Sequence, residues 1–387
     1  RLPTEGDVEL WANHLSDKQK KGVLKALGQI QNQDVDKYSP EVIAEYATEE
    51  LQDVGAENAL ARLNEQRQSE GEVDRESFQH MIERLDELEP VTLADTHNLR
   101  DVGKHLRPER REDGIRTGIG SLDQWTGGWH EGELSFLLAD SGVGKSISLV
   151  NFGVEAARFG HKVLHVTLEM SAKKTDMRYY RRITTRNKDE IQREVQEARK
   201  EARMFWDDRV EGDVFVEENN PQELSPSGLR SLVQMYDRRH GNIDLILLDY
   251  LDLMQAPSGY RNQGRYEQLG VVAHQIRSIG QEYEAAVVSA TQAQRPSGKQ
   301  YIERLSKANM GDSYKKVRAA DQIIGLVQTP EEEEMNQARL QLLKMRDRPG
   351  SGGEFDVYFN KDRMYIGDLD TPESQRIKEE EGDTLLI

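Results

Sequence analysis

The sequence predicts an α/β core with a mostly parallel sheet, preceded by a small all-helical domain. From residue 114 onward, short apolar runs alternate with helix-patterned stretches, which is typical of a parallel sheet covered by helices on both faces. Before residue 94, apolar residues recur three and four positions apart, as in amphipathic helices. The length of 387 residues also exceeds one ordinary domain. We therefore expect a helical domain (1–93), a linker (94–113), an α/β core (114–366) and an acidic tail (367–387).

The helical segment shows its period in three groups of apolar residues. These are Leu24, Leu27 and Ile30; Val42, Ile43 and Tyr46; and Phe78, Met81, Ile82 and Leu85. Residues 94–113 lose this period and concentrate charge, as a linker between domains does. The tail has high charge and few apolar residues, so we expect it to be disordered. The glutamate run 331–334 is interpreted as a solvated loop.

Seven apolar runs in the core are predicted strands. They are LSFLLA (134–139), VLHVTL (163–168), DLILLDY (244–250), AVVSAT (286–291), QIIGLV (322–327), LQLLKM (340–345) and FDVYF (355–359). Most are apolar at nearly every position, because strands buried on both faces need no polar side. Helix-patterned stretches separate most of these runs, as the crossover connections between parallel strands require.

Composition excludes several classes of protein. The chain has no cysteine, which excludes a disulfide framework and a cysteine-based zinc site. No apolar stretch approaches the roughly 18 residues of a membrane span or forms a secretory signal, so we expect a cytoplasmic protein without a membrane partner. The net charge is -18, from 70 acidic and 52 basic residues. The acidic excess lies at the two ends, so the core can still present a local basic surface to nucleic acid.

A phosphate-binding loop follows the first predicted strand. The segment Ala139–Ser146, ADSGVGKS, leads from that strand into a helix-patterned stretch, which is the context of a P-loop. Gly142 and Gly144 leave room for backbone N–H groups to close on the phosphates of ATP. Lys145 is expected to neutralise the β and γ phosphates, and Ser146 to hold Mg²⁺. The other positions expected to bind nucleotide are Ala139, which replaces the usual first glycine, and Ser141, Val143 and Ile147.

Two carboxylates are candidates for the hydrolysis of ATP. Asp249 ends a buried run, where P-loop ATPases place an aspartate that binds Mg²⁺. Its rival Asp252 is interpreted as a surface or capping acid. Glu169 directly follows the run 163–168, at the edge where open α/β sheets bind ligands, and is our candidate base for the attacking water. The alternative is that Glu169 is an acid of the first turn of the next helix. The histidines show no metal-ligand spacing, so ATP with Mg²⁺ is the only cofactor predicted.

Several different short motifs follow one another along the core in a characteristic order. They are Gly114-Ile-Arg-Thr-Gly118, Leu122-Asp123, Thr126-Gly127-Gly128 and Gly132-Glu-Leu134; Leu168-Glu169-Met170 with Arg178; Asp249-Tyr250-Leu251 with Leu253-Met254; Ser289-Ala-Thr-Gln292 with Arg295; and Lys344-Met-Arg346 with Gly350 and Gly353. Together they resemble the ATPase domain of the DnaB-type replicative helicases of bacteria and tailed phages. An alanine at the first P-loop position is also a feature of that family. The resemblance covers residues 114–366 and implies a RecA-like fold in a ring-shaped homo-hexamer.

The resemblance also implies roles and partners. Lys344 and Arg346 would act in trans on the nucleotide of a neighbouring subunit, and Gln292 would sense the γ-phosphate. For Gln292, a polar strand end without a coupling role is the alternative. The family moves 5′ to 3′ on single-stranded DNA, unwinds duplex, and works with a primase and a helicase loader in the bacterial cytoplasm or a phage-infected cell. The rival interpretation is a recombinase or clock-type RecA-like ATPase that binds DNA or partners without unwinding; the trans-acting pair argues against it.

Basic residues gather where the resemblance places a pore loop for single-stranded DNA. The predicted DNA contacts are Arg304, Lys307, Tyr314, Lys315, Lys316 and Arg318. Lysine and arginine would neutralise phosphates, and the tyrosine would stack on a base. This stretch is shorter than in the bacterial members, and a solvated helix face is the alternative. Residues 255–267 form either a second pore loop or an ordinary surface loop.

Overall fold

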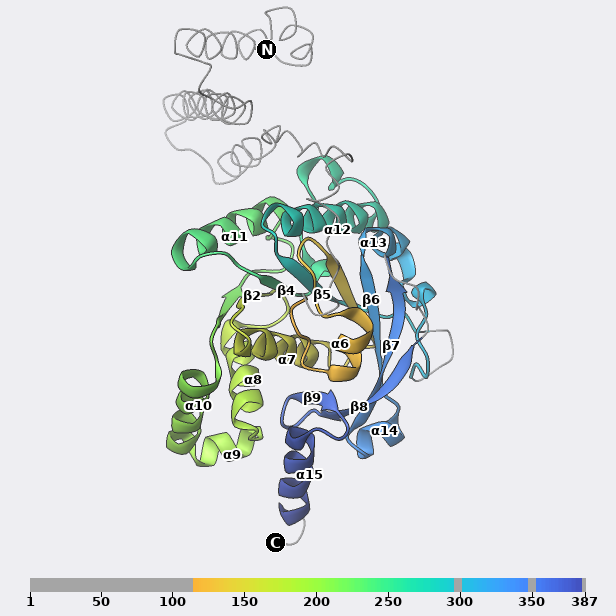
Figure 1. Cartoon of the computed structure of the whole chain (residues 1–387). Helices are drawn as coiled ribbons and strands as arrows, with labels where there is room; N and C mark the ends of the chain where they lie inside the picture. The colour runs from red at the N-terminus through yellow and green to blue at the C-terminus, as the bar shows by residue number, and fades with distance from the viewer. Residues whose placement is uncertain (1–113, 296–300, 347–352, 385–387) are drawn as a thin grey trace, which may run out of the picture. The chain divides into compact units, whose positions relative to one another are not determined.

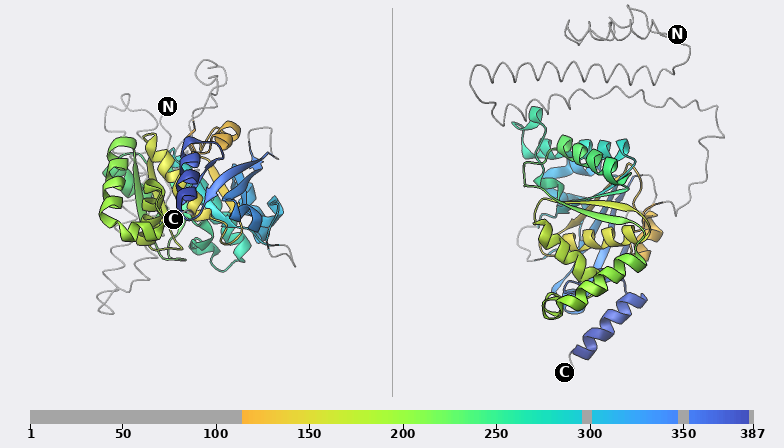
Figure 2. Two further views of the ribbon diagram at one scale, coloured as in Figure 1. Left: turned by 90° about the horizontal axis from the view of Figure 1, so that it is seen from below. Right: turned by 90° about the vertical axis from the view of Figure 1, so that its left-hand side faces the viewer.

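The computed structural model describes residues 114–295, 301–346 and 353–384. The chain divides between Pro108 and Glu109 into two units, and all described residues belong to the second. The predicted helical domain (1–93) and linker (94–113) lie outside the described residues. The described part has three layers, with one central sheet and helices on both of its faces (Figure 1, Figure 2).

One nine-stranded sheet runs through the described part, in the order β3-β2-β4-β5-β1-β6-β7-β8-β9. The strands are β1 (Leu134–Ala139), β2 (Lys162–Thr167), β3 (Asp213–Glu218), β4 (Leu245–Asp249), β5 (Ala286–Gln292), β6 (Gln322–Val327), β7 (Gln337–Met345), β8 (Glu354–Asn360) and β9 (Tyr365–Asp368). The first six pair in parallel, and the last three extend the sheet in antiparallel fashion. The mostly parallel sheet and all seven predicted strands are confirmed.

Helices cover both faces of this sheet. They are α6 (Gly120–Thr126), α7 (Lys145–Arg158), α8 (Ala172–Thr184), α9 (Lys188–Arg193), α10 (Val195–Arg209), α11 (Pro226–His240), α12 (Arg265–Glu282), α13 (Tyr314–Ala319), α14 (Pro330–Glu334) and α15 (Pro372–Thr384), with short 3₁₀ turns η3 (Leu251–Leu253), η4 (Ser258–Tyr260) and η5 (Lys307–Ser313). Helices α11, α12 and α13 pack on one face, and α7 packs on the other (Figure 1). Within the described ranges, none of these helices has the length and apolar character that crossing a membrane demands.

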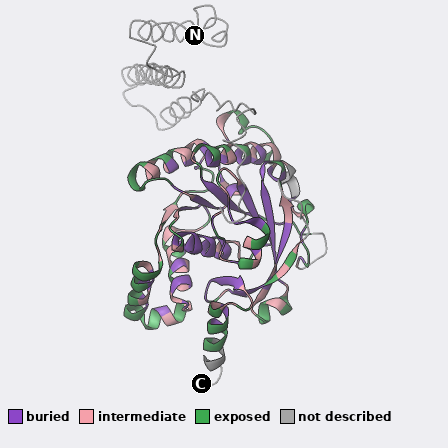
Figure 3. Ribbon diagram, viewed as in Figure 1, coloured by how far each residue is buried: buried purple, intermediate pink, exposed green. Residues whose placement is uncertain are grey.

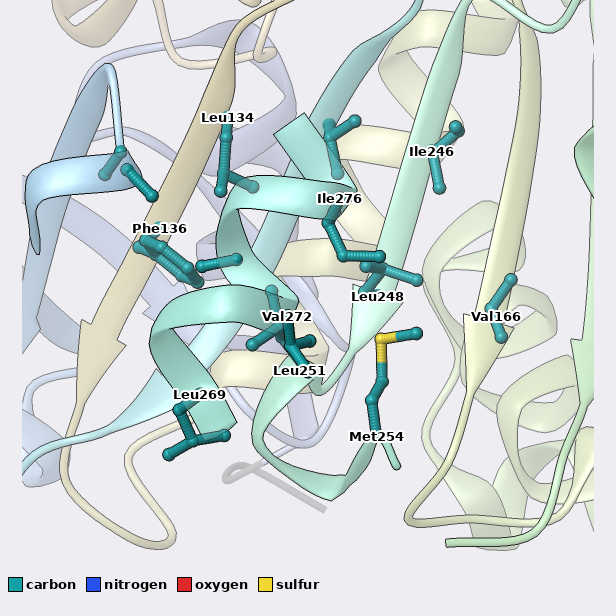
Figure 4. Packing of buried hydrophobic residues seen from close by; sticks show 14 of the residues in the cluster. Leu134, Phe136, Val166, Ile246, Leu248, Leu251, Met254, Leu269, Val272 and Ile276 are labelled. Atoms are coloured by element: carbon teal, nitrogen blue, oxygen red, sulfur yellow. The ribbon is translucent and has the colours of Figure 1, made fainter. Parts of the chain in front are cut away.

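The hydrophobic core lies on both sides of β1. Leu134 and Phe136 pack toward α12, whereas Leu137 packs toward α7, because successive side chains of a strand point to opposite faces. All six residues of β1 are buried, and most strands lie in the interior of the described part (Figure 3). Figure 4 shows the side chains on the α12 face. Burial of each large apolar side chain contributes about 1.5–3 kcal/mol to the stability of the fold. This packing holds the strands, and therefore the strand ends that carry the site, in place.

Two sequence predictions about acidic segments are wrong. Residues 372–384 of the expected disordered tail form α15, because Ile377 is fully buried against the tyrosines of β8 and β9 and Glu373 pairs with the buried Arg182. The run 331–334 is not a loop but most of α14. Thr329 caps the N-terminus of that helix, because its hydroxyl accepts from the backbone N–H of Glu332, whose side chain accepts from the backbone N–H of Thr329.

Candidate nucleotide-binding site

The loop from Ala139 to Ser146 connects β1 to α7 at the carboxyl edge of the parallel strands. Gly142 and Gly144 have φ angles of 78° and 124°, a region that favours glycine. A Cβ atom at Gly144 would also lie 2.2 Å from Cζ of Phe359, which belongs to β8. Lys145 folds back over the loop and donates from Nζ to the backbone oxygens of Ala139 (3.3 Å) and Asp140 (3.0 Å). The loop therefore has an open backbone cradle at a helix N-terminus, as phosphate binding requires.

Not every predicted lining residue offers a side chain to the nucleotide. Ala139, at the end of β1, is fully buried, and Ile147, on α7, is nearly so; both belong to the core between the sheet and α7. These two can contribute only backbone atoms. Ser141 is exposed, and Val143 and Ser146 are partly exposed. A cavity of about 310 Å³ adjoins the loop on the β6 side, between Val143, Arg295 and Gln328.

The sheet register brings the predicted hydrolytic residues to this same edge. Thr167 on β2 pairs with Asp249 on β4, and the backbone N–H of Leu168 donates to the backbone oxygen of Asp249 (2.8 Å). Glu169, the next residue, is thereby placed beside Asp249. It is exposed and precedes Ser171, the N-cap of α8, so it is not part of the first helical turn. Gln292, at the end of β5, pairs with Ala139 at the start of the loop.

Asp249 has the properties of a cation ligand. Only 1% of the residue is exposed, and neither carboxylate oxygen has a hydrogen-bond partner among the described residues. Burial raises the pKa of Asp249, and neighbouring Ser146 acts to lower it. A buried carboxylate without partners is unfavourable unless a cation satisfies it.

The donor set around Asp249 fits Mg²⁺. The described part of the chain contains no group of three or more acidic or histidine side chains that would enclose a metal. Mg²⁺ is commonly held by one or two protein oxygens, with water and substrate phosphates as its other ligands. One carboxylate beside the Ser146 hydroxyl matches that preference.

Two cations stand close to the carboxylates. Burial lowers the pKa of Lys145, whereas Glu169 and Asp249 act to raise it. Burial likewise lowers the pKa of Arg178 on α8, and the same two carboxylates oppose that effect. In the sequence, Arg178 belongs to a motif but has no predicted role. Its spacing from Glu169 is the signal that indicates a place at the site. Helix α8 begins at Ala172, and its turns bring Arg178 back toward the strand ends.

A second arginine touches the loop itself. Nε of Arg295 lies 2.5 Å from Oδ2 of Asp140, and Oδ1 of Asp140 accepts from the backbone N–H of Ser141 (2.7 Å). Arg295 lies three residues after Gln292, the last residue of β5. The ion pair thus ties the phosphate loop to the segment that leaves the adjacent strand. No local pattern predicts this pairing, because the two residues are far apart in the sequence.

Lys344 and Arg346 lie at the opposite edge of the sheet. Strand β7 runs antiparallel to β6, and Met345 pairs with Gln322, the first residue of β6. Because β6 is parallel to β1, this pairing places Lys344 and Arg346 away from the phosphate loop of their own chain. Such a placement is compatible with action on the nucleotide of another chain.

The predicted DNA-binding residues divide into exposed and buried members. Arg304, Lys307 and Arg318 are exposed, and Lys315 is partly exposed and pairs with Glu267. The side chain of Tyr314 lies outside the described residues.

The prediction that Lys316 contacts DNA is corrected by its burial. Only 2% of Lys316 is exposed, and Nζ donates to the carboxylate of Asp252 and to Oγ1 of Thr291 (2.8 Å). Asp252 is in turn not the surface acid that we expected, because it is the ion-pair partner of this buried lysine.

Residues 114–368 match the protein family described as "DnaB-like helicase C terminal domain". The replicative DNA helicase DnaB of Mycoplasma genitalium is 23% identical over 280 residues, which are 67% of this chain and 58% of that protein. The protein of the same name from Haemophilus influenzae is 27% identical over 205 residues, 50% of this chain and 42% of that protein. The chain thus spans about half the length of these curated relatives.

A solved structure described as a DnaB-like replicative helicase and its interactions with primase superposes with a TM-score of 0.64. It is 17% identical, and the match covers 94% of this chain and 88% of that chain. At this identity the likeness concerns the fold. The predicted RecA-like α/β fold of the core is confirmed.

Proposed function

Because the chain belongs to the DnaB-like helicase family through residues 114–368, we propose that it is the motor of a replicative DNA helicase. Six copies form a ring that hydrolyses ATP between subunits, moves 5′ to 3′ on single-stranded DNA and separates duplex strands. One observation carries the proposal. The phosphate loop with Asp249 and Glu169 lies at one edge of the sheet, whereas Lys344 and Arg346 lie at the other. A complete site then needs two subunits.

Within one subunit, the residues at the carboxyl edge bind and activate the substrate. Backbone N–H groups of the loop and Lys145 hold the β and γ phosphates. Bound Mg²⁺, held by Ser146 and Asp249, would neutralise charge on these phosphates. Glu169 accepts a proton from the attacking water as its oxygen bonds to the γ phosphorus. The bond from that phosphorus to the bridging oxygen breaks, which gives ADP and inorganic phosphate. Gln292 contacts the γ-phosphate and responds to its loss.

The neighbouring subunit supplies the remaining positive charge. Arg346 and Lys344 face the transferring phosphoryl group from the adjacent copy, where a trans arginine accelerates hydrolysis by about a thousandfold or more. Hydrolysis therefore depends on assembly. In the isolated chain both side chains contact α13 and the two residues after it, so they must change partners when a neighbour docks.

The exposed basic residues are the proposed DNA contacts. They are Arg304, Lys307, Lys315 and Arg318, with Tyr314 as a stacking residue. A ring of six copies concentrates these charges around its centre, although the whole chain has a net charge of -18. A primase and a helicase loader are the proposed partners. The solved relative described together with its primase supports the first of these.

Strand separation on a forked DNA with ATP and Mg²⁺ tests the proposal. Lys145→Ala and Arg346→Ala should each abolish unwinding. Arg239→Ala, an exposed arginine on α11, serves as the matched control and should unwind normally. If the unaltered protein shows DNA-stimulated hydrolysis without unwinding, the recombinase-like interpretation is correct instead.

A mixing experiment tests the shared site. Glu169→Ala and Arg346→Ala chains are inactive alone, but a mixed ring contains interfaces at which both intact residues meet. Partial recovery of hydrolysis on mixing supports the trans arrangement. No recovery in rings shown to contain both chains would contradict it.

A further inference from the structure

The buried Lys316 on α13 joins two segments that end at the nucleotide site. Its Nζ donates to the carboxylate of Asp252 and to Oγ1 of Thr291. Asp252 follows Asp249 by three residues, on the turn η3 that leaves β4, and Thr291 immediately precedes Gln292 on β5. The Lys316 ammonium also lies 5.9 Å from the centroid of the Phe136 ring on β1. One side chain therefore contacts three strands or their extensions beneath the proposed site.

The other end of α13 is held by the trans-acting pair. Nζ of Lys344 donates to the backbone oxygens of Val317 (2.6 Å) and Ala320 (2.5 Å), and Arg346 donates to that of Arg318 (2.8 Å). The last carbonyls of a helix lack partners within it and attract cations. These two side chains thus complete the C-terminal end of α13.

An acidic residue anchors this second contact. Asp321, which is 2% exposed, receives Arg346 on Oδ1 (2.6 Å) and Arg277 of α12 on both oxygens (2.7 and 3.1 Å). Its Oδ2 also accepts from the backbone N–H of Leu134 at the start of β1 (3.0 Å). The C-terminal end of α13 is therefore fixed at the amino edge of the sheet.

The two contacts of α13 lie at opposite edges of the sheet. Thr291 is near the carboxyl end of β5, where the phosphate loop of the same chain begins, whereas Asp321 precedes β6 at the amino edge. Helix α13 packs between them, beside α12 (Figure 1). It also carries Lys315 and Arg318 of the proposed DNA surface.

We propose that α13 transmits the state of two nucleotide sites to the DNA contacts, and that Lys316 is the positioning residue that couples it to the site of its own chain. The inference rests on the proposed function. Separating the partners of a buried ion pair is costly, because it leaves an uncompensated charge. A shift of Asp252 or Thr291 therefore moves Lys316, and α13 with it. At the other end, docking of Lys344 and Arg346 on a neighbouring nucleotide releases the carbonyls of α13. The DNA contacts respond to both events.

The test separates hydrolysis from its response to DNA. Rates of ATP hydrolysis are measured without DNA and across a titration with oligothymidylate, for the unaltered chain and for Lys316→Met. We expect the rate without DNA to stay within about twofold and the half-saturating DNA concentration to stay similar. The maximal stimulation should fall roughly tenfold, as the loss of a coupling interaction of ordinary size predicts.

Two further variants keep the test decisive. Arg182→Met removes another buried cation, which is 2% exposed and pairs with Glu155 and Glu373 away from α13; it should retain full stimulation. Thr291→Val removes one hydroxyl without removing a charge, and it decides the matter if Lys316→Met fails to fold or assemble. We expect it to reduce the maximal stimulation in the same direction.

The outcomes distinguish this inference from the proposed function. If the unaltered chain shows no stimulation by DNA, the proposed function fails. If the unaltered chain is stimulated and both Lys316→Met and Thr291→Val are stimulated equally well, the coupling role of Lys316 is wrong. Equal loss of the basal and stimulated rates in assembled Lys316→Met rings would also overturn it, because that result indicates a purely structural residue.

Discussion

Acid should destabilise this domain through His165, a fully buried residue on β2. Nδ1 of His165 lies 2.8 Å from the hydroxyl of Tyr179, and burial lowers the pKa of the imidazole to about 3. In the unfolded chain the same group titrates near its ordinary value of 6.5. Between these two values the unfolded state binds the proton and the folded state does not. The stabilisation is therefore complete above pH 6.5 and is lost as the pH falls toward 3.

The size of the effect follows from the two pKa values. At pH 4, His165 is protonated in the unfolded chain and mostly unprotonated in the folded chain. The free energy of unfolding at pH 4 is therefore lower than at neutral pH by about 3 kcal/mol from this group. A typical domain has only about 5–15 kcal/mol of total stability. Protonation of this one side chain thus removes a substantial part of it.

Urea unfolding at a series of pH values between 8 and 4 measures this contribution. The comparison is with His165→Gln, which keeps a polar partner for Tyr179 but does not titrate. Both chains lose stability in acid through their carboxylates, so the quantity of interest is the difference between the two curves. We expect the unaltered chain to lose about 3 kcal/mol more than the variant. Parallel curves would refute the assignment of a buried neutral imidazole.

Three other substitutions test the site and the corrected tail. Asp249→Asn should lower Mg²⁺-dependent hydrolysis by about a hundredfold or more, because an amide replaces the anionic ligand; normal hydrolysis would exclude Asp249 as that ligand. Gly144→Ala should weaken nucleotide binding in a fluorescence titration and lower stability by about 1–3 kcal/mol, owing to its positive φ and the overlap with Phe359. Unchanged nucleotide binding would contradict this geometry. Ile377→Ala should cost about 2–5 kcal/mol in urea unfolding, whereas the exposed Glu379→Ala should change little; equal effects would mean that α15 is not packed.

The sequence predicts the strands well where both faces are buried. The run LSFLLA coincides with β1 because each of its side chains packs against a helix layer. Strand β3 is missed because it is the edge of the sheet, and its exposed and half-exposed residues include three acids. Strand β9 has only four residues, too few to show a pattern. The tail is misjudged because its average charge conceals Ile377, which packs on the tyrosines of β8 and β9, and the distant partner of Glu373, Arg182.

The candidate site is predictable only where it depends on local sequence. Asp249 and Glu169 end apolar runs, and parallel strands bring such ends together. Long-range ion pairs leave no comparable trace. Lys316 resembles a surface lysine in sequence because its partner Asp252 is 64 residues away. Because Lys316 is buried, the two residues form an internal ion pair and do not act as contacts with solvent or ligand.

The contact between Phe359 and Gly144 has a consequence for protein synthesis. The phosphate cradle lies early in the domain, but the ring that backs it belongs to β8, which comes late in the same domain. A ribosome releases that strand only after nearly all of the domain has been translated. The nascent protein must therefore wait for its last strands before the cradle acquires its finished shape, and a product truncated before β8 would lack the backing of its own phosphate loop.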